Sequence, residues 1–173
     1  MFEENYIESV KIQFLQYKKL GEKAIDQVPE DKIYWSYNPE SNSIVTIVKH
    51  MSGNMLSRFT DFYTSDGEKK WRNRDGEFEN EMMKKVDLLE KWNEGWNSLF
   101  NILNTLSAES LSKKVKIRNE PHTVMEAINR QLTHYAYHVG QIIFLSKMIC
   151  DTHWKSLSIP KGKSDEINTK MGL

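Results

Sequence analysis

Three histidines carry the chemistry that this sequence is expected to perform. His134 and His138 stand four residues apart in QLTHYAYHVGQ, and His50 lies far upstream in IVKHMSGN. A four-residue step along a helix places two side chains on one face, one turn apart, so that both imidazoles can bind one metal ion. A third histidine from a second helix would complete a three-nitrogen set and leave coordination positions open, which is typical of a catalytic metal site.

The same histidine pair also allows a plainer interpretation, in which it belongs to a polar helix face turned to solvent. Two features argue against that interpretation. A solvent-facing stripe usually carries Lys, Glu or Asp, whereas none stands between Arg130 and Lys147. His50 also begins a polar line that continues to Asn54 and Arg58 at four-residue steps, beside the apolar stripe of its own segment. Because a polar line that borders the core is what a buried site requires, we predict that the three histidines lie together.

Polar residues one helical turn from the histidines are candidates to support them. Gln131 and Gln141 stand on either side of the pair in the fourth helical segment, and Asn54 follows His50 by one turn. Such residues can orient an imidazole or a bound water, although most polar residues near a site only satisfy hydrogen bonds. We therefore expect supporting roles for these three and for Arg58, without a defined catalytic residue among them.

Other reactive residue types fit less well. The residues between the paired histidines contain no glutamate, so the HExxH motif of metalloproteases is absent. Glu126 is the only carboxylate of the fourth helical segment and stands two turns before the pair, which makes it a poor ligand. His122 and His153 are interpreted as structural or surface residues. Cys150 is interpreted as a small buried apolar residue rather than a nucleophile.

The loop KKWRNRD leaves two interpretations open. Guanidinium groups bind carboxylates through two hydrogen bonds, so Arg72 and Arg74 in this loop, or Arg58 nearby, can be expected to bind an acidic cosubstrate. The plainer alternative, which we favour, is a solvated loop in which Trp71 packs against the helices and Asp75 pairs with one arginine.

The elements that must position these residues are helices, because Pro and Gly are scarce (4 and 8) and fall mostly between long periodic segments. The apolar periodicity predicts four helices, over residues 2–28, 44–63, 78–106 and 124–150. Ser43 is a plausible N-cap for the second, and Thr123 with Glu126 fits a capping box before the fourth. The stretch KVKIR is either a short strand or extended chain, and the tail after residue 150 has no helical period. We expect one domain over residues 1–173, an all-α four-helix bundle with long connections and an irregular C-terminal tail.

Composition excludes several classes of protein. The 173 residues suffice for one core, and 24 Lys and Arg balance 24 Asp and Glu, which disfavours binding to nucleic acid. One cysteine excludes an intrachain disulfide and fits a reducing compartment. The start MFEENYIESV lacks the pattern of a secretory signal, and the purely apolar runs are far too short to span a membrane. We therefore expect a cytoplasmic protein that neither binds nor enters a membrane.

The pattern of one histidine in the second helix and HxxxH late in the fourth resembles the DinB/YfiT-like superfamily of metal-binding four-helix bundles. The strings IVKHMSGNMLSRFTDF, WRNRD, HTVMEAINRQLTHYAYHVGQI and SLSIPKG are similar to an uncharacterised bacterial branch of that superfamily, over nearly the whole chain. The resemblance implies metal ligation by His50, His134 and His138, with zinc or nickel as the ion. It also implies a homodimer.

The chemistry implied by this resemblance is of two kinds. Some members are thiol-dependent transferases or isomerases that use bacillithiol or mycothiol, and others are described as metal-dependent hydrolases. We therefore expect a metal-dependent enzyme acting on a small molecule, with S-transfer from a bacillithiol-type thiol ahead of hydrolysis. The alternatives are a non-catalytic metal- or small-ligand-binding helical module, and a site that has lost its metal and serves only in packing.

Overall fold

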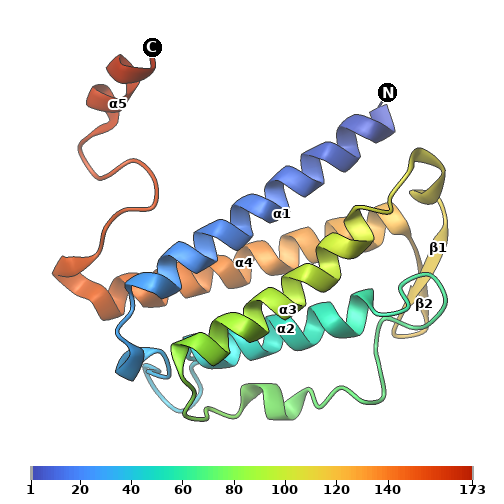
Figure 1. Cartoon of the computed structure of the whole chain (residues 1–173), viewed down its shortest axis with the longest axis horizontal. Helices are drawn as coiled ribbons and strands as arrows, with labels where there is room; N and C mark the ends of the chain where they lie inside the picture. Colours follow the sequence, from blue (N-terminus) through green and yellow to red (C-terminus); the bar gives the residue numbers. More distant parts are fainter. Residues whose placement is uncertain (1, 173) are drawn as a thin grey trace.

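Four long helices form most of this protein in the computed structural model, which describes residues 2–172 (Figure 1). They are α1 (Phe2–Gln27), α2 (Ile44–Phe59), α3 (Lys85–Leu103) and α4 (Val124–Cys150). A two-stranded antiparallel hairpin, β1 (Lys114–Ile117) and β2 (Glu120–Thr123), precedes α4, and a short helix, α5 (Ser164–Met171), follows it. Single 3-10 turns complete the described elements: η1 (Glu30–Lys32), η2 (Asp75–Phe78), η3 (Ala108–Ser110) and η4 (Asp151–His153). No helix within the described residues is long and apolar enough to cross a membrane.

The long helices pack in two pairs. The most extensive contacts join α2 with α3 and α1 with α4, and smaller contacts join α2 with α4 and α1 with α3. In Figure 1, α1 and α4 run in one direction and α2 and α3 run in the opposite direction. The chain must therefore return along the helices between α2 and α3, and this connection, residues 60–84, contacts the side of α2 through η2.

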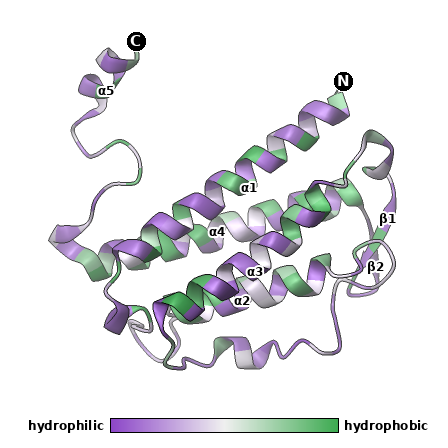
Figure 2. Cartoon of the chain, in the orientation of Figure 1, coloured by the Kyte–Doolittle hydropathy of each residue, from purple (hydrophilic) through white to green (hydrophobic). Residues whose placement is uncertain are grey.

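Aromatic side chains occupy the centre of the core. Along α1 and α3, apolar and polar residues alternate around the ribbon, as expected for helices with one buried face (Figure 2). Trp92, Trp96, Phe14 and Tyr135 are fully buried. The ring centroid of Trp96 lies 5.4 Å from that of Trp92 and 5.9 Å from that of Tyr135, and both distances are within the range of favourable aromatic pairs. Because Tyr135 belongs to this core, the rotation of α4 is determined, and so is the direction in which its histidines point.

The local signals for two helix starts are confirmed. The Ser43 hydroxyl accepts a hydrogen bond from the backbone N–H of Thr46 at 3.2 Å, which caps α2. The Thr123 hydroxyl accepts from the Glu126 N–H at 3.1 Å, and the Glu126 carboxylate accepts from the Thr123 N–H at 2.6 Å. This reciprocal capping box defines the start of α4.

Four predictions of the elements need correction. Helix α2 ends at Phe59, short of the predicted residue 63, because Thr60 is extended and Asp61 has a positive φ. Helix α3 begins at Lys85 and ends at Leu103, so it is shorter than the predicted 78–106, because residues 75–78 form η2 instead. The KVKIR stretch is a strand, one of the two alternatives, and it adds a small sheet to the predicted all-α fold. The tail is not irregular throughout, since residues 164–171 form α5. An ion pair between Lys170 and Glu166 at 2.9 Å and two acidic residues in the first turn support this helix.

Candidate metal centre

Helices α2 and α4 bring three imidazole nitrogens together. The Nε2 atom of His134 lies 3.4 Å from Nε2 of His50 and 3.1 Å from Nε2 of His138. One candidate ligand atom from each of the three residues lies within 4.8 Å of the others, and His50 and His138 are buried. The prediction that the three histidines lie together is therefore confirmed, and the group can bind a metal ion.

The second ring nitrogen of two histidines is held by an oxygen acceptor. Nδ1 of His50 lies 3.1 Å from Oε2 of Glu77, and Nδ1 of His138 lies 2.8 Å from Oε1 of Gln141. Because these oxygens accept hydrogen bonds, each Nδ1 carries the proton and donates it. The lone pair of a neutral imidazole is then on Nε2, so the contacts with Glu77 and Gln141 direct both lone pairs toward the third histidine.

Burial favours the neutral form of the α4 histidines. Burial, together with the smaller effects of the neighbouring His138 and His50, lowers the pKa of His134 to about 3. Burial likewise lowers the pKa of His138 to about 4, against a smaller opposing effect of the hydrogen bond with Gln141. Near pH 7 these imidazoles are uncharged, and their Nε2 atoms face each other at 3.1 Å, about hydrogen-bond distance. A divalent cation suits this donor set, because neutral imidazole nitrogens are ligands for zinc and similar ions.

Glu77 is the supporting residue that the sequence did not reveal. It lies in η2, in the long connection, and its side chain is only 9% exposed. Arg72 donates from Nε and Nη2 to the two carboxylate oxygens, each at 2.7 Å. Burial alone would raise the pKa of Glu77, but hydrogen bonds from His50 and Arg72 outweigh that effect and lower it. Glu77 is therefore ionised, and it links Arg72 to His50 by accepting hydrogen bonds from both.

Gly53 makes room for this carboxylate on the surface of α2. A Cβ atom at position 53 would lie 2.1 Å from Oε1 of Glu77, far inside van der Waals contact. Any larger residue would displace Glu77 from His50. The glycine is visible in the sequence three residues after His50, but nothing local indicates which side chain approaches it.

A pocket of about 350 Å³ opens beside the triad. Its lining comprises His50, Asn54, Arg58, Arg72, Arg74, Arg118, Arg130, Gln131, Thr133, His134 and Tyr137. The pocket volume is in the range of small-molecule sites, and two of the three histidines form part of its wall. The histidine group is therefore reached from this pocket rather than enclosed in the core.

The four supporting candidates lie in different places. Gln141 contacts Nδ1 of His138. Asn54 lines the pocket, and its Oδ1 accepts a hydrogen bond from the Tyr135 hydroxyl at 2.9 Å. Gln131 is buried in the pocket wall, and Arg58 donates to the backbone carbonyl of Gly67 and to Glu68.

The loop that carries Trp71, Arg72 and Arg74 differs from the interpretation that we favoured. Arg72 and Arg74 both line the pocket, but Arg72 is engaged with Glu77 and Glu68. The expectation that Trp71 packs against the helices is wrong, since 59% of this residue is exposed. The guanidinium carbon of Arg74 instead lies 5.6 Å from the centroid of the Phe78 ring.

Fold and site together define a mostly helical protein with three clustered histidines that can bind a metal at the edge of an arginine-lined pocket. The chain belongs to a family described as Protein of unknown function (DUF1572), whose family model matches residues 1–163. No curated protein matches the chain.

Proposed function

We propose that this protein is a metal-dependent enzyme on a DinB-like four-helix bundle, in which His50, His134 and His138 hold one divalent ion, zinc or nickel. One observation carries the proposal: three Nε2 atoms converge beside an open pocket, while Nδ1 of two of the rings is committed to Glu77 and Gln141. A hydrogen on Nε2 of His134 could be donated to a flanking imidazole, whereas a divalent cation would accept the lone pairs of all three rings at once.

Bound by three neutral imidazoles, such an ion would act as a Lewis acid and make a bound water or thiol more acidic. The residues of the chain prepare the site for it. Glu77 and Gln141 hold two ligands in orientation, and Arg72 keeps Glu77 ionised in a buried position. The adjoining pocket supports an enzyme over the alternative of a non-catalytic binding module, because a substrate can reach the histidine wall.

Within this class, S-transfer from a bacillithiol-type small thiol is the first reaction to test, and hydrolysis is the second, because the same histidines serve both. The single thiol of the chain does not supply the nucleophile. Cys150 is buried, its Sγ donates to the backbone carbonyl of Gln27 at 3.3 Å, and burial raises its pKa. A thiol-dependent reaction would therefore take its thiol from a small cosubstrate. The homodimer stays a prediction, which sedimentation equilibrium would test.

The deciding experiment is the metal content of purified, untagged protein, measured by elemental mass spectrometry. We expect close to one divalent ion per chain in the wild type, and loss of this ion in His50→Ala and in His138→Ala. His153→Ala is the matched control, because this exposed histidine of η4 lies outside the triad and its loss should leave the metal content unchanged. Circular dichroism would verify that the variants are folded. A wild type that takes up no metal after incubation with zinc and nickel would overturn the proposal.

A further inference from the structure

Every arginine of this chain lines the same pocket. Arg58 comes from α2, Arg72 and Arg74 from the long connection, Arg118 from the hairpin turn and Arg130 from α4. None of the 19 lysines, which make up the rest of the 24 basic residues, lines it. Lysine and arginine carry the same charge, so charge alone does not explain this selection. The property that separates them is the planar guanidinium fork, which matches the oxygens of carboxylates and phosphates.

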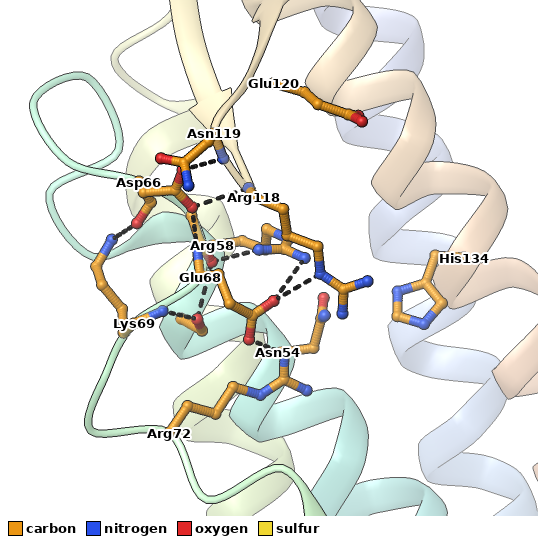
Figure 3. Close-up of polar contacts among 12 residues, drawn as sticks. Asn54, Arg58, Asp66, Glu68, Lys69, Arg72, Arg118, Asn119, Glu120 and His134 are labelled. Atoms are coloured by element: carbon orange, nitrogen blue, oxygen red, sulfur yellow. Dashed lines mark hydrogen bonds and ion pairs between the residues drawn. The ribbon is translucent and has the colours of Figure 1, made fainter.

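The carboxylates around these arginines do not balance them. Glu68 is shared by three guanidinium groups, those of Arg58 at 3.3 Å, Arg72 at 3.4 Å and Arg118 at 3.1 Å (Figure 3). Glu77 is the other carboxylate paired with an arginine of the pocket, and that arginine is Arg72. In the described part of the chain, Arg74 and Arg130 form no ion pair. With Asp66, which lies at the Arg118 turn, five guanidinium groups face three carboxylates, so the pocket keeps an excess of positive charge.

Two buried side-chain atoms in the pocket wall have no hydrogen-bond partner within residues 2–172. Arg58 is 5% exposed and its Nε has no hydrogen-bond acceptor among the described residues. Gln131 is 3% exposed and its Oε1 has no donor there. Because buried polar groups are nearly always hydrogen-bonded in native proteins, the unpaired Nε of Arg58 is a donor that an acceptor group of a bound molecule can satisfy. Gln131 Oε1 is itself an acceptor, so a donor group rather than an oxyanion would satisfy it.

The hairpin turn holds Arg118 in a conformation that its side chain disfavours. Arg118 and Asn119 have φ values of 54° and 63°, in the left-handed region that a two-residue hairpin turn requires. Asparagine and glycine suit this region, and arginine does not. Asp66 stabilises the turn by accepting from the backbone N–H of Arg118 at 2.9 Å and of Asn119 at 2.7 Å.

This strained position has a functional consequence. The guanidinium group of Arg118 points from the turn toward the face of α4 that carries His134 (Figure 3). Its side chain is 56% exposed, and only Nε is engaged, with Glu68. Its remaining N–H groups are therefore available to a ligand. Strained residues are concentrated at functional sites, where the rest of the structure holds them in place.

We propose that this pocket binds the oxyanion group, a carboxylate or a phosphate, of a small anionic substrate beside the histidine triad. Arg118 contacts the oxyanion from the turn, and Arg58 and Arg130 contact it from the helices. The part that this anion plays as substrate rests on the proposed metal-dependent function. Oxyanion binding by the arginines does not, so the two are tested separately.

The test is calorimetric titration of the protein with inorganic phosphate, with succinate and with uncharged succinamide, both as purified and after treatment with EDTA. We expect phosphate or succinate, but not succinamide, to bind both preparations. Comparison of the two anions distinguishes a phosphate receptor from a carboxylate receptor. Arg118→Asn should weaken binding about tenfold to a hundredfold, as expected for the loss of charge-assisted hydrogen bonds. Because asparagine suits the turn, this variant should unfold at the same temperature as the wild type or higher.

Two further variants separate anion binding from folding and from overall charge. Arg130→Gln changes an exposed residue on α4 and should also weaken binding. Lys114→Gln removes one charge from the same hairpin outside the pocket and should change affinity less than about twofold. Unchanged affinity in both arginine variants would overturn the proposal, as would equal binding of succinamide. If metal-free His138→Ala still binds the anion, the arginine site is supported even if the metal proposal fails. If His138→Ala loses anion binding while Arg118→Asn keeps it, the proposed arginine site is overturned.

Discussion

The histidine triad and the Glu68 cluster, which consists of Glu68 with Arg58, Arg72 and Arg118, adjoin one pocket but are built differently. The triad stands on two long helices, His50 and His138 are buried, and each is held at Nδ1 by an oxygen. The Glu68 cluster draws most of its residues from a loop and a hairpin turn. Its carboxylate is 30% exposed and Arg118 is 56% exposed.

This difference matches how much positional variation each expected ligand, a metal ion or an oxyanion, tolerates in the groups that bind it. A metal ion requires its ligands within a few tenths of an ångström, which rigid helices and buried hydrogen bonds provide. An oxyanion surrounded by several guanidinium forks can be bound in more than one arrangement, so partly exposed side chains are sufficient. Arg72 belongs to both regions, because it binds Glu77 beneath the triad and Glu68 in the cluster.

The largest effect that would test the comparison is expected at Glu77. In Glu77→Ala, the Arg72 side chain, which is 2% exposed, would lose its two-pronged partner and His50 would lose its acceptor. Breaking such a buried pair costs about 3 kcal/mol of unfolding free energy. Urea denaturation would measure this loss. Glu81→Ala is the matched control, because Glu81 pairs with Lys49 at 3.0 Å but is 55% exposed. Its removal should cost less than about 1 kcal/mol. Equal losses of unfolding free energy in Glu77→Ala and Glu81→Ala would show that the buried pair beside the triad contributes no more to stability than an exposed surface pair.

A pair of glycines on α2 and α4 sharpens the comparison at the metal. In Gly53→Ala, the new methyl group must displace Glu77 from His50, so zinc affinity should fall about tenfold to a hundredfold, the usual effect of losing a ligand's supporting hydrogen bond. A Cβ at Gly140 would meet nothing within 4 Å. Gly140→Ala should therefore keep the zinc affinity and stabilise α4 by up to about 1 kcal/mol. Competition with a chromophoric chelator measures both affinities, and an unchanged value in Gly53→Ala would remove Glu77 from the supporting role.

The smallest effect concerns the turn that carries Arg118. Partial burial raises the pKa of Asp66, but hydrogen bonds from the backbone N–H groups of Asn119, Glu68 and Arg118 outweigh it and lower the pKa below the ordinary value. A lowered pKa in the folded state means that the ionised form stabilises the protein above the ordinary Asp pKa, and that this contribution is lost as the pH falls through the lowered value.

Asp66→Asn should therefore lower the unfolding free energy by about 1 kcal/mol at pH 7, and the gap from the wild type should narrow toward pH 3. Urea titrations at the two pH values measure the gap. Asp165→Asn, in the exposed α5, serves as the control and should show little difference at either pH. A gap for Asp66→Asn that is independent of pH would mean that the ionised carboxylate does not hold the turn.

Residues whose roles depend on local spacing were predictable. The four-residue step from His134 to His138, the Ser43 cap and the capping box at Thr123 all act within one or two turns of a helix. The clustering of His50 with the pair also followed, because its polar line borders the apolar stripe of α2. The start of α3 was not predictable, since the apolar pattern continues through residues 78–84 while η2 and the following extended chain replace the helix there.

The sequence by itself determined that there are four long helices, that Ser43 and Thr123 cap α2 and α4, and that His134 and His138 share one helix face, because periodicity and capping are properties of neighbouring residues. Only the tertiary structure decided that Glu77 supports His50, that Gly53 makes room for it, and that all five arginines meet at one pocket. These relations join segments from 24 to 72 positions apart, as between Gly53 and Glu77 or Arg58 and Arg130. They depend on the route of the long connection and on the fit of charged groups that come into contact only after the helices have packed.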